Sequence, residues 1–452
     1  MDLLLDGVQY IVDLGASVML PIIIFILALC LKQGVGKSLQ SGITIGIGFI
    51  GIGLVVGLLR DSLGPAAEAM AKEFNLGLKV VDLGWPGTAP IAWASDLGLI
   101  AIPIAVAVNL LMVALKLTKV INIDIWNIWH MAFTGAIVQV ATGNIYLGMI
   151  AIAIHAVIAY KLGDMFGQVT DGYFGLDGIS IPHGTSAYMG VFAVPIDDFI
   201  SKIPVLNKIE LTEETIEKRL GVLGQPTIVG AVMGIVIGLL AKYPVGKAMQ
   251  LGIQMAGVMV LMPMVVKLIM QGLLPISEAA KSILDKKFKG SNLKIGLDPA
   301  LLLGDSQVIA SSLLFVPLTI LIAIIVPGNQ VLPFGDLATI GFFIAIATGI
   351  HKGNIFRTLI SGSVIMFITI WISNQMIHLQ TTLGEKVGVL AKGGEKVSSL
   401  DQAGSPITYL LAKGFTFEMG IGFFVILLLY LGAFFYTFVK YKKEMIYIDE
   451  IE

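Results

Sequence analysis

Long apolar stretches, separated by short polar segments, occupy almost the whole chain. A helix needs about 20 mostly apolar residues to cross a bilayer, and eleven stretches approach or reach that length. They are Ile11–Leu31, Ile43–Leu59, Leu97–Leu115, Val120–Val140, Ile145–Tyr160, Pro226–Ala241, Ala248–Leu273, Val308–Val326, Val331–Ile350, Ile355–Ser373 and Phe417–Val439. The pattern predicts an all-α polytopic membrane protein with eleven transmembrane helices.

The two halves of the chain carry matching polar and small residues in the same order, about 210 residues apart. The matches include Val35-Gly36-Lys37 with Val245-Gly246-Lys247, Pro65 with Pro275, Asp82 with Asp298, Asp124 with Asp336, and Gly143-Asn144-Ile145 with Gly353-Asn354-Ile355. Each half contains five predicted spans, so the second half enters the membrane from the opposite face. The duplication therefore predicts two inverted repeats, as found in transporters.

This organisation divides the chain into five parts. Residues 1–160 form the first inverted repeat, 161–225 a cytoplasmic or re-entrant connecting segment, and 226–377 the second repeat. Residues 378–416 are expected to form an external loop, and 417–452 the last helix with a cytoplasmic tail. Lys and Arg favour the cytoplasmic side, so the basic flank Lys440–Lys443 places the C-terminus inside and the N-terminus outside.

Two segments are too short and too interrupted by Asp, Gly and Pro to cross the membrane. They are Val80–Pro90 and Ile295–Ser306, at corresponding positions of the two halves. Irregular backbone at membrane depth requires protein or water as a hydrogen-bonding partner. A matched pair of re-entrant hairpins therefore indicates a central binding site. A pair of ordinary surface loops is the alternative.

Composition excludes several classes of protein. Hydrophobic residues make up 56% and charged residues 13%, whereas a soluble domain has about 25% charged residues. A net charge of −2 gives no reason to expect a nucleic-acid partner. The single cysteine, Cys30, lies in an apolar stretch, and no Cys or His spacing suits a metal. We expect neither a metal nor a cofactor.

Polar residues within apolar surroundings are the candidates for function, because an ionisable group at membrane depth is costly. The candidate substrate-binding residues are Asp82, Trp85, Asp124, Asn127, His130, Gln139, His183, Thr185, Asp298 and Asp336. On a helix, Asn127 and His130 fall roughly on the side of Asp124, and Gln139 returns near that face. Carboxylates, amides and imidazoles beside aromatic rings suit a neutral polyhydroxy compound. Asn144 and Asn354 precede helices and are expected to be N-caps.

Several longer motifs carry a family resemblance. They are Val81–Gly87, Asp124–His130, Ile181–Gly190, Gly296–Gly304 and Val326–Thr339. Together they closely resemble the galactitol-type membrane component, enzyme IIC, of the bacterial sugar phosphotransferase system. This type shares a superfamily with the ascorbate transporters. The resemblance covers nearly the whole chain and is weakest at the C-terminus and in Gln380–Lys396.

The resemblance implies a permease that carries galactitol or a related hexitol across the bacterial inner membrane. A separate IIB subunit, phosphorylated on its own cysteine through IIA and phosphoenolpyruvate, would phosphorylate the cargo, so no catalytic residue is expected on this chain. Eleven spans, inverted repeats, a homodimer and a core that moves as an elevator are implied as well. By the same resemblance His130, Gln139, His183 and Asp336 match substrate-contacting residues.

Two other functions remain open at this point. An ion-coupled secondary transporter of a polyol or sugar would also use inverted repeats and intramembrane aspartates. A membrane-embedded enzyme without transport is the third possibility. No nucleophile–base pair is evident in the sequence, which argues against the enzyme.

Overall fold

The computed structural model of the chain describes residues 16–30, 32–73, 79–124, 126–212, 214–215, 218, 225–287, 293–333, 335–394 and 396–445. Five helical segments in these ranges are long and apolar enough to cross a membrane: Val35–Val55, Ile145–Gly172, Ser306–Ile325, Ile355–Lys386 and Ile421–Lys442. All five overlap spans predicted from the sequence. The prediction of a mostly helical, polytopic membrane protein is confirmed at this level.

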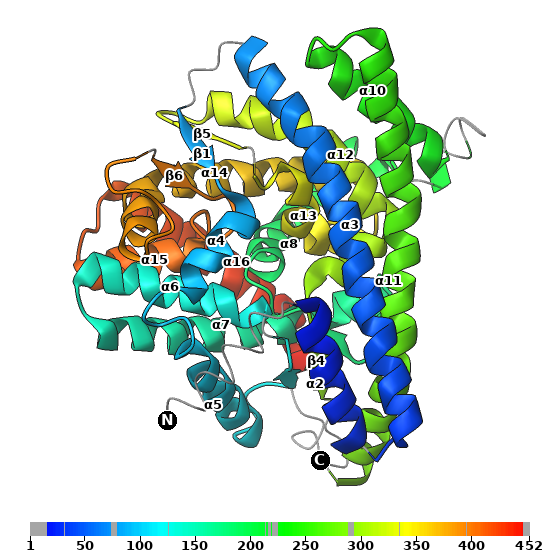
Figure 1. Cartoon of the computed structure of the whole chain (residues 1–452), viewed down its shortest axis with the longest axis vertical. Helices are drawn as coiled ribbons and strands as arrows, with labels where there is room; N and C mark the ends of the chain where they lie inside the picture. Colours follow the sequence, from blue (N-terminus) through cyan, green and yellow to red (C-terminus); the bar gives the residue numbers. More distant parts are fainter. Residues whose placement is uncertain are drawn as a thin grey trace.

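Four helices form a long bundle along one side of the molecule. They are α2 (Ala16–Cys30), α3 (Val35–Glu73), α10 (Pro226–Leu240) and α11 (Val245–Lys287). Figure 1 shows α3 and α11 side by side along the longest axis. Three glycines of α10, Gly230, Gly234 and Gly238, face α11, where an added Cβ would come within 2.8 Å of an atom of that helix. Small residues at this spacing let the two backbones approach closely.

The other described helices form a second, larger group, which contains the polar residues considered in the next subsection. They are α4 (Gly84–Trp93), α5 (Ala101–Ala114), α6 (Trp126–Thr142), α7 (Ile145–Gly172), α8 (Ser186–Lys202), α12 (Ser306–Ile325), α13 (Ile340–Ile350), α14 (Ile355–Lys386), α15 (Pro406–Thr416) and α16 (Ile421–Met445). In the part of the chain that the structure describes, three short 3-10 helices accompany them, η1 (Leu206–Lys208), η3 (Pro299–Gly304) and η4 (Leu337–Thr339). This group lies beside the long bundle in Figure 1.

Two small parallel sheets lie within the larger group. The strands are β1 (Val80–Asp82), β2 (Val120–Asn122), β3 (Ile179–Ser180), β4 (Lys294–Gly296), β5 (Val331–Leu332) and β6 (Val397–Ser398). In one sheet β1 lies between β5 and β6, and in the other β4 lies between β2 and β3. Each central strand therefore pairs with two strands from the other half of the chain. This pairing satisfies extended backbone that lipid could not.

The strands correct two predicted spans. Val120–Val140 and Val331–Ile350 were each expected to be one helix, but each begins with a strand and continues as a helix after a break. In the first, Val120 and Ile121 pair with Lys294 and Ile295 of β4. These strand pairings stabilise extended backbone that the apolar pattern alone does not distinguish from helix.

The segment expected to be an external loop also differs from the prediction. Helix α14 continues to Lys386, and β6 and α15 follow. Within residues 399–408 the side chains of Leu400, Asp401, Gln402 and Thr408 are buried. The reason is β6, which pairs with β1 and draws this part of the chain into the interior.

Candidate polyol-binding centre

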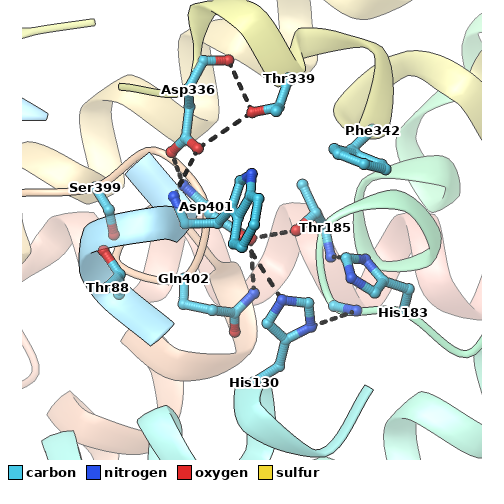
Figure 2. A network of polar contacts seen from close by, with 12 residues as sticks. Thr88, His130, His183, Thr185, Asp336, Thr339, Phe342, Ser399, Asp401 and Gln402 are labelled. Atoms are coloured by element: carbon cyan, nitrogen blue, oxygen red, sulfur yellow. Dashed lines mark hydrogen bonds and ion pairs between the residues drawn. The ribbon is translucent and has the colours of Figure 1, made fainter. Parts of the chain in front are cut away.

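Three aspartates meet at one edge of the β5-β1-β6 sheet. Asp82 ends β1, while Asp336 and Asp401 follow β5 and β6 by a few residues. The strands are parallel, so their carboxyl ends lie at the same edge. Figure 2 shows Asp336 and Asp401 together with Thr339, Thr185 and the histidines below them.

The carboxylates of Asp82 and Asp336 accept hydrogen bonds mainly from backbone. Asp82 accepts from the N–H groups of Gly84 at 2.9 Å, Asp336 at 2.9 Å and Leu400 at 3.1 Å. Asp336 accepts from the N–H groups of Trp85 at 3.0 Å and Asp401 at 2.9 Å. These two buried side chains thereby hold the segments after β1, β5 and β6 together.

The Asp401 side chain points toward a histidine. Its Oδ1 accepts hydrogen bonds from the Thr185 hydroxyl and, at 3.1 Å, from the Gln402 amide. Its Oδ2 lies 3.6 Å from Nε2 of His130, which is longer than a hydrogen bond. Figure 2 shows Asp401, Thr185, Gln402 and His130 converging on one another.

Two histidines lie in edge-to-face contact, with ring centroids 4.2 Å apart. Nδ1 of His130 accepts a hydrogen bond from the Gly184 N–H at 3.1 Å. Nδ1 of His183 accepts one from the Thr185 N–H at 3.3 Å. A neutral imidazole that accepts at one nitrogen carries its proton on the other, so both Nε2 atoms are donors. Nε2 of His183 lies 3.9 Å from Oδ2 of Asp298.

The β2-β4-β3 sheet brings the remaining candidates to the same centre. Asp124 follows β2, and its Oδ1 accepts from the Trp126 N–H at 2.9 Å. Asp298 follows β4 and caps η3 by accepting from the Ala300 N–H at 2.7 Å. The Asn127 amide donates to Asn122 at 2.7 Å.

Several polar atoms of this centre are buried without a hydrogen-bond partner. Among the described residues they are Trp85 Nε1, Asp124 Oδ2, Asn127 Oδ1, His130 Nε2 and Gln402 Oε1. A buried polar atom left unpaired costs about 1–3 kcal/mol, and native proteins keep few of them. Five in one centre, two donors and three acceptors, indicate a place for a ligand with several hydrogen-bonding groups.

Gln139 lies outside this centre. Its amide donates to Asp96 at 2.8 Å, and Lys386 donates to the same carboxylate at 3.0 Å. The hydrogen bond from Lys386 is the main reason that the pKa of Asp96 is below its ordinary value. Of the ten predicted site residues, the structure thus gathers nine near the two sheets and separates Gln139. The predicted N-caps are confirmed, because Asn144 accepts from Tyr146 and Leu147, and Asn354 from Arg357.

Asp401 and Gln402 were not among the sequence candidates. They lie in the stretch that was expected to be a loop. Asp401 follows the end of β6 by three residues, as His183 follows the end of β3. The two positions correspond only once the third strand of each sheet is known.

Comparison with known proteins decides the family. The family model described as the PTS system sugar-specific permease component matches residues 10–394. The chain belongs to this permease family. It is 53% identical to a PTS system galactitol-specific EIIC component of Escherichia coli K12, over 98% of this chain and 99% of that protein. It is 37% identical to a putative permease IIC component of the same strain, over 90% and 94%. Members of this family are membrane components of the phosphotransferase system, and the buried centre described above is the candidate sugar site of such a permease.

Proposed function

We propose that this chain is the galactitol permease of a phosphoenolpyruvate-dependent phosphotransferase system. It binds the polyol in the centre between the two sheets and presents it to a separate IIB subunit for phosphorylation. The observation that carries the proposal is the set of five unpartnered polar atoms in that centre. The 53% identity to a protein named galactitol-specific supports the choice of polyol.

The chemistry of the centre complements a linear polyol. Each hydroxyl of galactitol can donate one hydrogen bond and accept others. The centre offers both kinds of partner, with Trp85 and His130 as donors and Asp124, Asn127 and Gln402 as acceptors. The indole rings of Trp85 and Trp126 are 5.7 Å apart and provide apolar surface for the C–H side of the carbon chain.

We divide the candidate residues by role. Trp85, Asp124, Asn127, His130, His183 and Asp298 are proposed to contact the polyol. Thr185 acts through the Asp401 carboxylate, to which it is hydrogen-bonded. Asp82 and Asp336 are positioning residues, because their oxygens accept backbone N–H groups of the surrounding segments.

The membrane architecture is proposed as the sequence predicts it, except that the fourth and ninth crossings each begin with a short strand and continue as a helix. It comprises eleven crossings, two inverted repeats within 1–160 and 226–377, an external N-terminus and a cytoplasmic C-terminus, in the bacterial inner membrane as a homodimer. The reciprocal exchange of strands supports the repeats: β1 pairs with β5 and β6, and β4 pairs with β2 and β3. IIA and IIB subunits of the same system are the expected partners.

The decisive experiment is uptake of radiolabelled galactitol in cells that lack their own system. The chain is expressed with and without its IIA and IIB partners, and the intracellular label is identified chemically. We expect galactitol phosphate, and only when the partners are present. Accumulation of unmodified galactitol without them would instead establish an ion-coupled secondary transporter.

Replacing Gln139 by Ala is expected to change galactitol uptake by less than about twofold. Its side chain contacts Asp96 at the surface, and surface substitutions usually change stability by less than about 0.5 kcal/mol. Initial uptake rates at limiting galactitol provide the measurement. A loss of uptake comparable to that of a His130 substitution would return Gln139 to the binding site.

A further inference from the structure

We propose that Asp401 and Gln402, in the segment between β6 and α15, form a subsite with His130 that recognises one particular hydroxyl of the polyol. This inference rests on the proposed function and names specificity-determining residues for it. The segment lies in the part of the chain that the sequence assigned to an external loop, and neither residue was a candidate there.

The separation between Asp401 and His130 is the first argument. Nε2 of His130 carries a proton and has no partner, and it lies 3.6 Å from the carboxylate Oδ2. The two groups are too far apart for a good direct hydrogen bond. A hydroxyl oxygen placed beside both accepts from Nε2 and donates to Oδ2. One hydroxyl therefore pairs with the unpartnered Nε2 of His130 and with Oδ2 of Asp401 at the same time.

The second argument is that the carboxylate is already held in place. The Asp401 N–H donates to Asp336 at 2.9 Å, and Oδ1 accepts from Thr185 and Gln402. These contacts fix the side chain and leave Oδ2 directed at His130. A site whose geometry is fixed in advance loses little conformational entropy when the ligand binds.

Gln402 supplies the third argument. Its Nε2 is used by Asp401, while its Oε1 is buried and has no partner. The side chain is fully buried, with 0% exposure, so water cannot readily replace a missing ligand group. The subsite thus presents one donor, His130, and two acceptors, Asp401 and Gln402.

The one donor and two acceptors of the subsite define the kind of ligand group that can bind there. The bound group must both accept and donate a hydrogen bond, as a hydroxyl does. A methylene or methyl group at the same position would leave Nε2 of His130 without a partner and Oδ2 of Asp401 without the hydroxyl donor. Sites that pair buried polar groups with a substrate hydroxyl strongly reject the analogue that lacks it.

The test is equilibrium binding of galactitol and its monodeoxy derivatives to the purified full-length chain in lipid nanodiscs. For the unaltered chain we expect at least one derivative to bind about 100-fold more weakly than galactitol, since hydrogen bonds to charged groups contribute about 1.5–3 kcal/mol. In Asp401→Asn, the amide cannot accept the hydroxyl proton at the position of Oδ2. We expect weaker galactitol binding and discrimination against that one derivative reduced to less than about threefold.

Asp96→Asn is the matched control, because it makes the same chemical change at an exposed carboxylate and should leave the whole binding panel unaltered. If Asp401→Asn does not yield folded protein, Gln402→Met provides the second variant. It removes the unpartnered Oε1 at similar length and should also reduce discrimination at one hydroxyl.

Full discrimination by both variants against every derivative would overturn the subsite. If Asp401→Asn does not fold, full discrimination by Gln402→Met would by itself overturn the subsite. Absence of galactitol binding by the unaltered chain is a different result. It would overturn the proposed function, and the subsite for this ligand with it.

Discussion

Replacing Asp336 by Asn is expected to lower galactitol uptake by about 30-fold or more while the chain remains in the membrane. Both oxygens of the Asp336 carboxylate accept backbone N–H groups, one from Trp85 and one from Asp401. An amide can accept only one of them and turns a second donor toward the other. Each buried donor left unpaired costs about 1–3 kcal/mol, and here the cost falls on the segment that carries Asp401.

Uptake rates, normalised to the amount of chain in the membrane fraction, measure this effect. Asp96→Asn again serves as the control, because its carboxylate accepts from exposed side chains rather than from buried backbone. If Asp336→Asn takes up galactitol at the unaltered rate, the hydrogen bonds that join Asp336 to Trp85 and to Asp401 do not maintain the site.

Replacing Gly84 by Ala is expected to prevent formation of the β5-β1-β6 sheet. Gly84 has φ +62°, and a Cβ there would lie 2.6 Å from the carbonyl carbon of Gly335. A left-handed backbone costs a residue with a side chain about 1–2 kcal/mol. The steric conflict is larger, because the atom in the way is backbone and cannot rotate aside. We expect loss of uptake and a lower melting temperature of the purified chain.

Gly143→Ala separates the two effects. Gly143 has a similar φ of +69°, but nothing lies within 4 Å of the position of its Cβ. The free energy of unfolding of Gly143→Ala should therefore fall only by the cost of the left-handed backbone, about 1–2 kcal/mol. Equal melting temperatures for the two variants would mean that the close contact of Gly84 with Gly335 does not contribute to stability.

The apolar pattern predicted the long helices well and the strands poorly. The predicted span Ile355–Ser373 lies within α14, and the predicted span Phe417–Val439 overlaps α16 from Ile421 onward. Val120 and Ile121 look the same in sequence as the first turn of a helix, yet they form β2. A local apolar run does not specify which partner its backbone will find, and strands of three residues are stable only through such partners.

The candidate site was also only partly accessible to sequence reasoning. Aspartates in apolar surroundings identified Asp82, Asp124, Asp298 and Asp336, because charge at membrane depth is costly and therefore conspicuous. The sequence could not separate the aspartates that we propose to position the site from those that we propose to bind the polyol, since our division depends on which N–H groups reach them. Helical spacing and the family resemblance both placed Gln139 with the site, whereas the structure pairs it with Asp96.

By itself, the sequence determined the membrane class, the positions of the long helices, the duplication and the family resemblance, because each depends on composition or on local patterns. The tertiary structure alone decided that β1 and β4 each pair with strands from the other half. It also decided that Asp401, between β6 and α15, faces His130. Contacts between residues that are hundreds of positions apart are determined by packing and backbone hydrogen bonding, and no local pattern encodes them.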